Sequence, residues 1–194
     1  MKYKYDHDCP FEAYITNLGK YNEGCLVGEW VKFPTDQDTL DAVLKRIGIG
    51  SCDAFGCPYE EFFITDYDIY VDGLSCEMFG YNCGEYANLD SLNELAQAFE
   101  NVSDYDTEKV YAVLEFESAT NVEEILEVLE DLDDYYFYPD VNNEWDLGYY
   151  WIEESGCYDL KDLGCLSGYI DYERFGRDCA MDGLFTDYGF VERG

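Results

Sequence analysis

Basic side chains are scarce in this sequence. Its 194 residues hold 11 Lys and Arg against 44 Asp and Glu, which gives a formal net charge of −33. A protein that binds DNA or RNA needs cations that face the phosphates, and a field this negative repels polyanions and anionic membrane surfaces. We therefore expect no nucleic-acid partner and no membrane partner, and we expect any charged macromolecular partner to be basic.

Catalytic motifs are missing as well. His7 is the only histidine, so histidine acid–base chemistry and Ser-His or Cys-His nucleophiles have no partner set. No GxGxxG turn, GxxxxGK[ST] loop or GxSxG elbow occurs. A carboxylate pair such as Glu153 and Glu154 would satisfy a glycosidase pattern, but any chain with 44 acids offers such pairs. We predict that the protein is not an enzyme and uses no cofactor.

Long apolar runs are also absent. No stretch approaches the roughly 18 apolar residues of a membrane helix, and the first ten residues are charged and lack the apolar region of a signal peptide. The expected location is therefore the cytoplasm.

The nine cysteines include no C-x-x-C pair, and their number is odd, so we expect mostly free thiols. Cys52, Cys57, Cys76 and Cys83 have the wrong spacing for a structural zinc site and are predicted to be small buried hydrophobes. No EF-hand loop occurs among the many acids. We predict no metal site, and only diffuse, weak binding of cations.

Apolar residues are plentiful despite the charge. Hydrophobic residues make up 47% of the chain and aromatic residues 18%, which is enough to build a core. The charge is concentrated in residues 47–160, where 29 acids meet a single base, Lys109. The sequence therefore indicates a folded protein with a strongly acidic central block.

Hydrophobic periodicity predicts an α+β arrangement at the start of the chain. Alternating patterns predict strands from Phe11, over residues 25–34 and over residues 60–71. Thr35 or Asp36 is placed to cap a helix after the second of these strands. The following stretch, residues 73–86, is rich in glycine and predicts an irregular boundary loop.

Three helices are predicted after that loop. Ser91 with Glu94 and Thr120 with Glu123 form capping-box pairs for the first and the third helix, and the second helix follows Asp106 or Thr107. The helix after Thr120 has an apolar stripe, and seven carboxylates within twelve residues fill its remaining positions. These acids are Glu123, Glu124, Glu127, Glu130, Asp131, Asp133 and Asp134.

The spacing of these seven acids is comparable to that of charges on DNA. Twelve helical residues span about 18 Å, or about 2.6 Å per charge, while duplex DNA carries one charge per roughly 1.7 Å. A merely solubilising surface needs a net charge of only about 2 to 8 for a small domain, which favours a functional interpretation. Apolar anchors between the acids fix the carboxylates on a rigid surface, so we expect imitation of a polyanion of defined shape. The alternative is an acidic carrier or chaperone for basic DNA-binding proteins, although such proteins usually concentrate acids in low-complexity tails.

Five sequence blocks resemble the ArdA antirestriction family and occur in the family's order. They are AYITNLGKYNEGCLVGEWVKFP (13–34), YEEFFITDYD (59–68), EYANLDSLNELA (85–96), YYWIEESG (149–156) and GYIDYERFGRD (168–178). The resemblance implies an elongated, bent, three-domain mimic of B-form DNA, usually a dimer, carried by mobile genetic elements. It further implies an inhibitor of type I restriction-modification enzymes, with the methyltransferase core and specificity subunit as partners. Combined with the pattern above, it places a small α+β domain at 1–72, a helical middle domain at 73–117 and an α+β domain at 118–194.

The resemblance also adds residues to the candidate site. The family's antirestriction motif corresponds to residues 146–159 here, so Trp145 and Trp151 gain interest and the acidic enzyme-binding surface extends beyond the helix. The added acids are Asp146, Glu153 and Glu154. Tyr149, Tyr150 and Trp151 are possible dimer contacts, since Tyr and Trp are common interface anchors.

Overall fold

The computed structural model describes residues 7–194, apart from the side chains of Asp162, Leu163 and Leu166. The chain forms two compact units. One comprises the residues up to 104 together with 119–127, and the other comprises 105–118 together with 128–194. Each unit combines helices with a three-stranded sheet, so the predicted α+β class is confirmed. The division into three domains at 72/73 and 117/118 stays a prediction.

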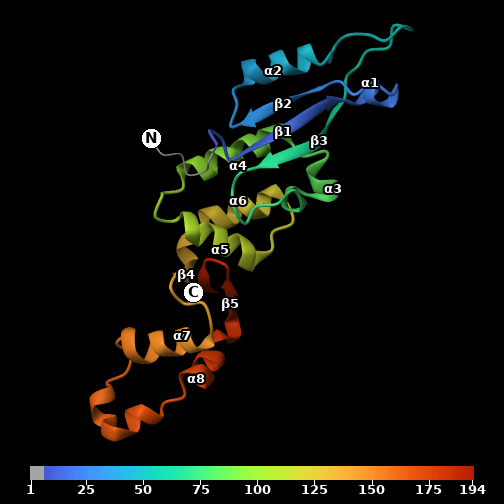
Figure 1. Cartoon of the computed structure of the whole chain (residues 1–194). Coiled ribbons are helices and arrows are strands. Elements are labelled where there is room, and N and C mark those ends of the chain that lie inside the picture. The colour runs from blue at the N-terminus through green and yellow to red at the C-terminus, as the bar shows by residue number, and fades with distance from the viewer. Residues whose placement is uncertain (1–6) are drawn as a thin grey trace. The chain divides into compact units, whose positions relative to one another are not determined.

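The sheet of the first unit has the strand order β2-β1-β3, with β1 (Phe11–Asn17) between β2 (Gly28–Phe33) and β3 (Phe62–Ile69), as Figure 1 shows. Both pairings are antiparallel. Successive side chains of a strand point to opposite faces, and the alternate residues Phe11, Ala13 and Ile15 are fully buried. The three predicted strands are therefore confirmed, with ends displaced by one to three residues.

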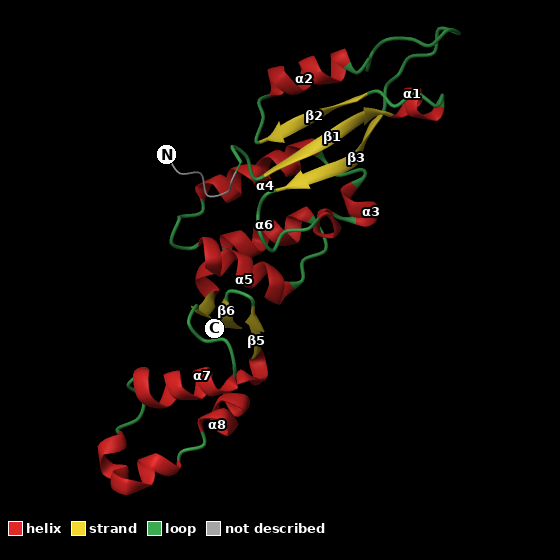
Figure 2. Ribbon diagram, viewed as in Figure 1, coloured by secondary structure: helices red, strands yellow, loops and turns green. Residues whose placement is uncertain are grey.

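Helices connect and cover these strands (Figure 2). A short helix, α1 (Leu18–Asn22), occupies the connection between β1 and β2. Helix α2 (Gln37–Arg46) contacts β2, and Asp36 caps it by accepting a hydrogen bond from the backbone N–H of Thr39 at 2.7 Å. Of the two predicted caps, the structure uses Asp36.

Residues 73–86 contain two short turns of helix, η1 (Cys76–Phe79) and α3 (Tyr81–Gly84), where an irregular loop was predicted. Helix α4 (Leu89–Asn101) follows and contacts β2. Its predicted Ser91–Glu94 capping box is wrong. The side-chain oxygen of Asn88 accepts from the backbone N–H groups of Asp90 and Ser91, so the helix starts earlier and Ser91 lies inside its first turn.

The sheet of the second unit has the antiparallel order β4-β6-β5, formed by β4 (Tyr135–Tyr138), β6 (Gly189–Arg193) and β5 (Gly183–Thr186). Helix α5 (Thr107–Glu117) contacts all three strands. Glu117 at its end accepts a hydrogen bond from the hydroxyl of Tyr135 at 2.6 Å and pairs with Arg193 at 3.5 Å. Side-chain contacts thus tie α5 to both β4 and β6.

The remaining helical elements complete the chain, and none of the described helices combines the length and apolar content that crossing a bilayer requires. They are α6 (Val122–Glu130), η2 (Leu132–Asp134), α7 (Glu144–Tyr149), the π-helical turn η3 (Tyr150–Glu154), η4 (Leu160–Tyr169), α8 (Tyr172–Cys179) and η5 (Ala180–Asp182).

All nine cysteines are free thiols. The prediction that four of them are buried hydrophobes is wrong, because Cys52 and Cys57 are exposed and Cys76 and Cys83 are half-buried. The first two flank a tight turn in which the Asp53 carboxylate accepts the backbone N–H of Cys57, and such a turn leaves its side chains in solvent.

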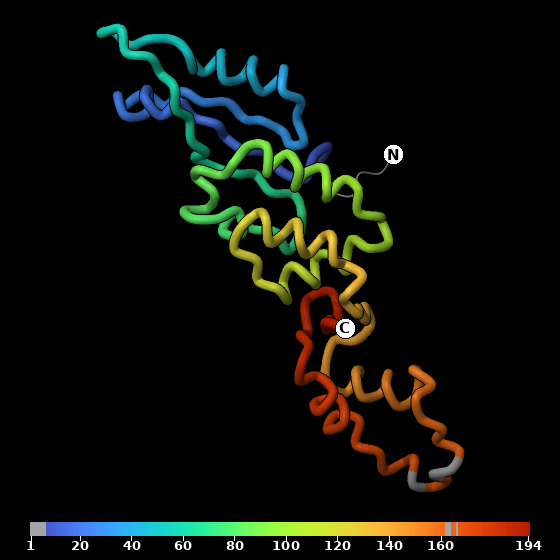
Figure 3. Tube along the Cα trace, turned by 180° about the vertical axis from the view of Figure 1, so that it is seen from behind, coloured from blue at the N-terminus to red at the C-terminus, as the bar shows by residue number. Residues whose placement is uncertain are grey.

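Helices α7 and α8 lie side by side in the second unit, as the tube in Figure 3 also shows, and touch through their backbones. A Cβ added to Gly148 would overlap the carbonyl oxygen of Tyr172, and one added to Gly176 would overlap the carbonyl oxygen of Glu144. The close approach therefore depends on two glycines that face each other.

We expect Gly176→Ala to lower the free energy of unfolding by roughly 1–3 kcal/mol, the usual cost of overpacking. A Gly→Ala change inside a helix ordinarily stabilises a protein by roughly 0.5–1 kcal/mol. A loss of stability in Gly176→Ala would therefore indicate the close approach of the two helices. The matched control is Gly168→Ala in η4, where an added Cβ meets no atom within 4 Å. Urea unfolding measures both variants. Equal or greater stability of Gly176→Ala than of Gly168→Ala would contradict the close approach.

Candidate functional site

Helix α6 starts with a reciprocal set of hydrogen bonds, one residue later than predicted. The side chain of Asn121 accepts the backbone N–H of Glu124 at 2.9 Å, and the Glu124 carboxylate accepts the backbone N–H and the hydroxyl of Thr120 at 2.8 and 3.0 Å. The predicted Thr120–Glu123 capping box is therefore wrong, and Asn121 with Glu124 takes its place. These hydrogen bonds, led by the backbone N–H of Thr120, lower the pKa of the Glu124 carboxyl.

The exposed and buried positions of α6 separate cleanly. Val122, Ile125 and Val128 are buried, while the four glutamates of the helix are exposed. The exposed acids continue into η2 and the residue before it. In order along the chain they are Glu123, Glu124, Glu127, Glu130, Asp131, Asp133 and Asp134.

Within the part of the chain that the structure describes, none of these seven acids forms an ion pair. The observed ion pairs use other acids, such as Glu29 with Arg46 at 2.6 Å and Glu144 with Arg177 at 3.3 Å. Opposite charges at helical spacing normally relieve repulsion on an acidic helix. On α6 that relief is missing, so its carboxylates remain available to cations from outside.

Asp146, the first acid of the antirestriction segment, is half-buried and helps to cap α7. Its carboxylate accepts the backbone N–H of Asn142 at 3.1 Å and the side-chain amide of Asn143 at 2.7 Å. The Asn143 side chain in turn accepts the backbone N–H of Asp146 at 3.0 Å. Asp146 thus uses its hydrogen-bonding capacity within the chain, unlike most of the acids on α6.

Glu153 and Glu154 are exposed at the end of η3. The hydroxyl of Tyr172 on α8 donates to the Glu153 carboxylate, which fixes its direction. Glu154 lines an open cleft of about 370 Å³ together with Asp140 and Tyr149. Sequence reasoning missed Asp140, although its place directly after Pro139 marks an exposed turn beside the same motif.

The three predicted aromatic dimer contacts have different environments. Tyr150 and Trp151 pack against a core of Val141, Leu147 and Phe190. Tyr149 is exposed and stacks on Trp145, with ring centroids 5.1 Å apart. These two stacked rings are exposed to solvent, as is Tyr158 further along the motif.

The geometry defines an acidic α+β protein in which α6 and η2 carry a run of exposed carboxylates. The sequence matches the family described as Antirestriction protein (ArdA) over residues 13–192. The chain therefore belongs to the ArdA antirestriction family, which confirms the resemblance noted in its sequence. No curated protein matches the chain in a sequence search.

We expect Glu124→Gln to lower the thermal midpoint at neutral pH, because it weakens the hydrogen bonds at the start of α6 and removes a negative charge from a helix N-terminus. The pKa of Glu124 is lowered from its ordinary value of 4.5 in the folded state. Its stabilising contribution is therefore complete above pH 4.5 and is lost as the pH falls through the folded-state pKa.

The measurement is a series of melting curves from neutral to acidic pH for the wild type and for Glu124→Gln. Glu123→Gln is the matched control, since it removes the same charge from the same exposed turn. The deficit of Glu124→Gln should shrink towards zero in acid. A deficit that is independent of pH, or equal for the two variants, would contradict the assigned cap.

Proposed function

We propose that the protein is a DNA mimic that inhibits type I restriction-modification enzymes by occupying their DNA-binding groove. Supporting this proposal most directly is the run of exposed acids on α6 and η2, which have no ion-pair partners among the described residues, in a chain of the antirestriction family. A groove that binds DNA presents Lys and Arg to phosphates, and the same cations can pair with carboxylates held at a similar spacing.

The geometry of α6 gives its carboxylates a spacing similar to that of phosphates. Glu123, Glu127 and Glu130 are separated by four and three residues, so they lie near one another along one side of α6. Seven residues rise about 10.5 Å, which places these carboxylates about 5 Å apart along the axis. Each strand of B-form DNA carries one phosphate per roughly 3.4 Å of axis, a similar interval.

The mechanism is displacement without turnover. Each exposed ion pair contributes about 0–1 kcal/mol, so affinity comes from many pairs rather than from a single dominant contact. Glu153 and Glu154 on η3 extend the acidic surface within the second unit. In this proposal the protein is a stoichiometric inhibitor and not an enzyme. Its partners are the methyltransferase core and the specificity subunit of the restriction-modification enzyme.

The proposal includes the remaining expectations for the family. The protein acts in the cytoplasm of a cell that has acquired a mobile genetic element, and it has the three-domain architecture of a DNA mimic. It works as a homodimer, for which the stacked rings of Trp145 and Tyr149 offer an exposed aromatic contact.

The decisive measurement is competition between the protein and labelled DNA for a purified type I methyltransferase core, titrated at several salt concentrations. We expect mutually exclusive binding that weakens as salt rises, because screening and counterions act on both competitors. A stable ternary complex of protein, enzyme and DNA would overturn the mimic. Equal binding to histones and other basic proteins would favour the acidic carrier instead.

Charge reversal tests the acidic surface itself. We expect joint replacement of Glu123, Glu127, Glu130 and Asp131 by Lys to weaken enzyme binding by more than about tenfold, because four attractive pairs of up to about 1 kcal/mol each become repulsive. The quadruple variant leaves the cap at Glu124 and the buried Ile125 intact. Each single reversal should cost less than about tenfold, which is 1.4 kcal/mol.

The matched control for this variant reverses four exposed acids that lie outside α6 and η2 and makes the same change in net charge. These acids are Glu60, Glu61, Asp72 and Glu94. If this control weakens binding as much as the α6 variant does, net charge and not the surface of α6 determines affinity.

A further inference from the structure

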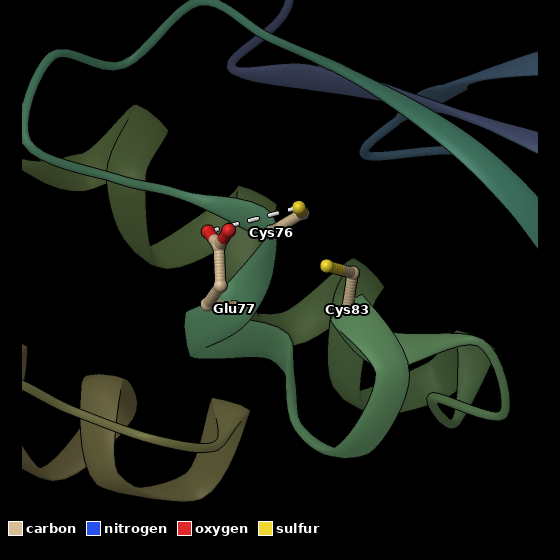
Figure 4. Close-up of side chains that lie close together, drawn as sticks. All are labelled: Cys76, Glu77 and Cys83. Atoms are coloured by element: carbon tan, nitrogen blue, oxygen red, sulfur yellow. Dashed lines mark hydrogen bonds between the residues drawn. The ribbon is translucent and has the colours of Figure 1, made fainter.

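Two thiols and a carboxylate converge in the first unit, between β3 and α4. Cys76 and Glu77 lie on η1 and Cys83 lies on α3, and one ligand atom from each lies within 4.8 Å of the other two. Figure 4 shows the two sulfur atoms turned towards each other, with the carboxylate beside Cys76. The Cys76 thiol donates to the Glu77 carboxylate at 3.8 Å. These three residues are called the Cys76 cluster below.

An unusual backbone brings the second thiol into place. Asn82 and Cys83 both have left-handed conformations, with φ of 51° and 54°, between Gly80 and Gly84, which also have positive φ. A left-handed conformation costs a residue with a side chain roughly 1–2 kcal/mol. Two such residues in succession reverse the chain within one turn and direct Cys83 back towards Cys76.

The surrounding packing holds this turn. Phe79 is buried against the rings of Phe11 and Tyr67, with centroids 5.3 and 4.8 Å away. The Tyr67 hydroxyl donates to the carbonyl oxygen of Gly84 at 2.9 Å, and the backbone N–H of Ile64 donates to the carbonyl oxygen of Glu85. The cluster therefore rests on the sheet and does not belong to a free loop.

We propose that Cys76, Glu77 and Cys83 bind a divalent cation of the zinc class through two thiolates and one carboxylate. Zinc binds Cys sulfur at about 2.3 Å and carboxylate oxygen at about 2.0–2.2 Å, so two sulfurs of a tetrahedral site lie roughly 3.8 Å apart. Because the ligand atoms lie within 4.8 Å of one another, the two sulfurs have to approach by about 1 Å or less to reach that geometry. Solvent would supply the fourth ligand, as in zinc sites that have three protein ligands.

The chemistry of the cluster favours this class of ion. Magnesium and calcium prefer oxygen ligands alone, whereas thiolates select zinc and softer metals. Bound zinc would displace the thiol protons and offset the mutual repulsion of the three ligands. The net charge of −33 also raises the concentration of cations near the surface.

A metal in the Cys76 cluster would join η1 to α3. It would thereby fix the turn that connects β3 to α4, and binding to the folded state alone would stabilise the first unit. This structural role does not depend on the proposed inhibition of restriction enzymes.

The first test uses the full-length wild-type protein, reduced with a phosphine and stripped of metal with a chelator. Cysteine alkylation is followed site by site by mass spectrometry, with and without one equivalent of Zn²⁺. We expect Zn²⁺ to slow alkylation of Cys76 and Cys83 by at least about tenfold, because a metal-bound thiolate is a poorer nucleophile. Cys52 and Cys57, which are exposed and flank Asp53, serve as the internal control and should react at an unchanged rate.

Co²⁺ provides an independent spectroscopic probe. One equivalent should produce the charge-transfer absorption of a cobalt–thiolate complex in the wild type and in a Cys52→Ser, Cys57→Ser variant. The signal should be lost in Cys76→Ser, Cys83→Ser. Glu77→Gln should weaken binding by at least about tenfold, since even residues that only orient metal ligands change affinity by that factor.

Several outcomes would overturn the proposal. One is equal alkylation of Cys76 and Cys83 with and without Zn²⁺ in the wild type, a result that needs no variant to fold. Equal protection by Mg²⁺ would show that the thiolates do not coordinate. A Cys76–Cys83 disulfide that persists in the phosphine, while Cys52 and Cys57 stay reduced, would make the pair a covalent link instead.

Discussion

Repulsion between like charges is the constraint on which the rest of this structure depends. Two unit charges 4 Å apart interact by about 1 kcal/mol in bulk water and by several times that near a low-dielectric surface. The fold therefore has to keep its carboxylates in water while it fixes the backbone that carries them. Helix α6 meets both needs, because Ile125 is fully buried while Glu123, Glu127 and Glu130 are exposed. Burial of apolar side chains supplies the free energy that offsets the repulsion.

The acids divide into two groups by what their oxygens contact. Glu124, Asp146 and Glu117 accept hydrogen bonds from the chain and fix a helix start or a helix-to-sheet contact. Glu127 and Glu130 are exposed and outside the observed ion pairs of the described residues. The first group positions the backbone, and the second group remains free for a basic partner. A uniformly solvated acidic tail would have no such division, because it has no regular elements to cap.

The sequence predicts strands and apolar stripes well, because hydrophobic periodicity reports the side that is buried. It predicts helix starts less well. Thr120 and Asn121 are both residue types that can cap a helix, and in the structure Asn121 does so. A cap has to be the residue at which the backbone changes from extended to helical, and local sequence does not determine that residue. The Cys76 cluster was missed for a related reason. Its two cysteines have six residues between them, outside zinc-knuckle spacing, and the left-handed conformations of Asn82 and Cys83 close that gap.

The candidate site shows the same limit. Composition identifies the acids of α6, but the hydrogen bond from Tyr172 to Glu153 joins two elements through residues 19 positions apart and depends on how the second unit folds. The compact units are themselves discontinuous in sequence, because α5 packs on strands that begin 18 or more residues after it ends. Local sequence patterns place domain boundaries at loops. They carry no signal for the packing of a helix on strands that come much later in the chain.

The two kinds of cation chemistry proposed for this chain have opposite consequences. Mobile ions that screen the carboxylates of α6 relieve repulsion and thus favour the folded state, but they also weaken every pair that these carboxylates could form with a basic groove. Added salt should therefore raise the stability of the fold and weaken the proposed inhibition. A zinc-class ion held by Cys76 and Cys83 uses thiolates that take no part in the exposed acidic surface. Such an ion would stabilise the first unit by binding to its folded state and would not screen the exposed carboxylates, so the fold would gain from a cation without loss of the charge on which the proposed mimicry depends.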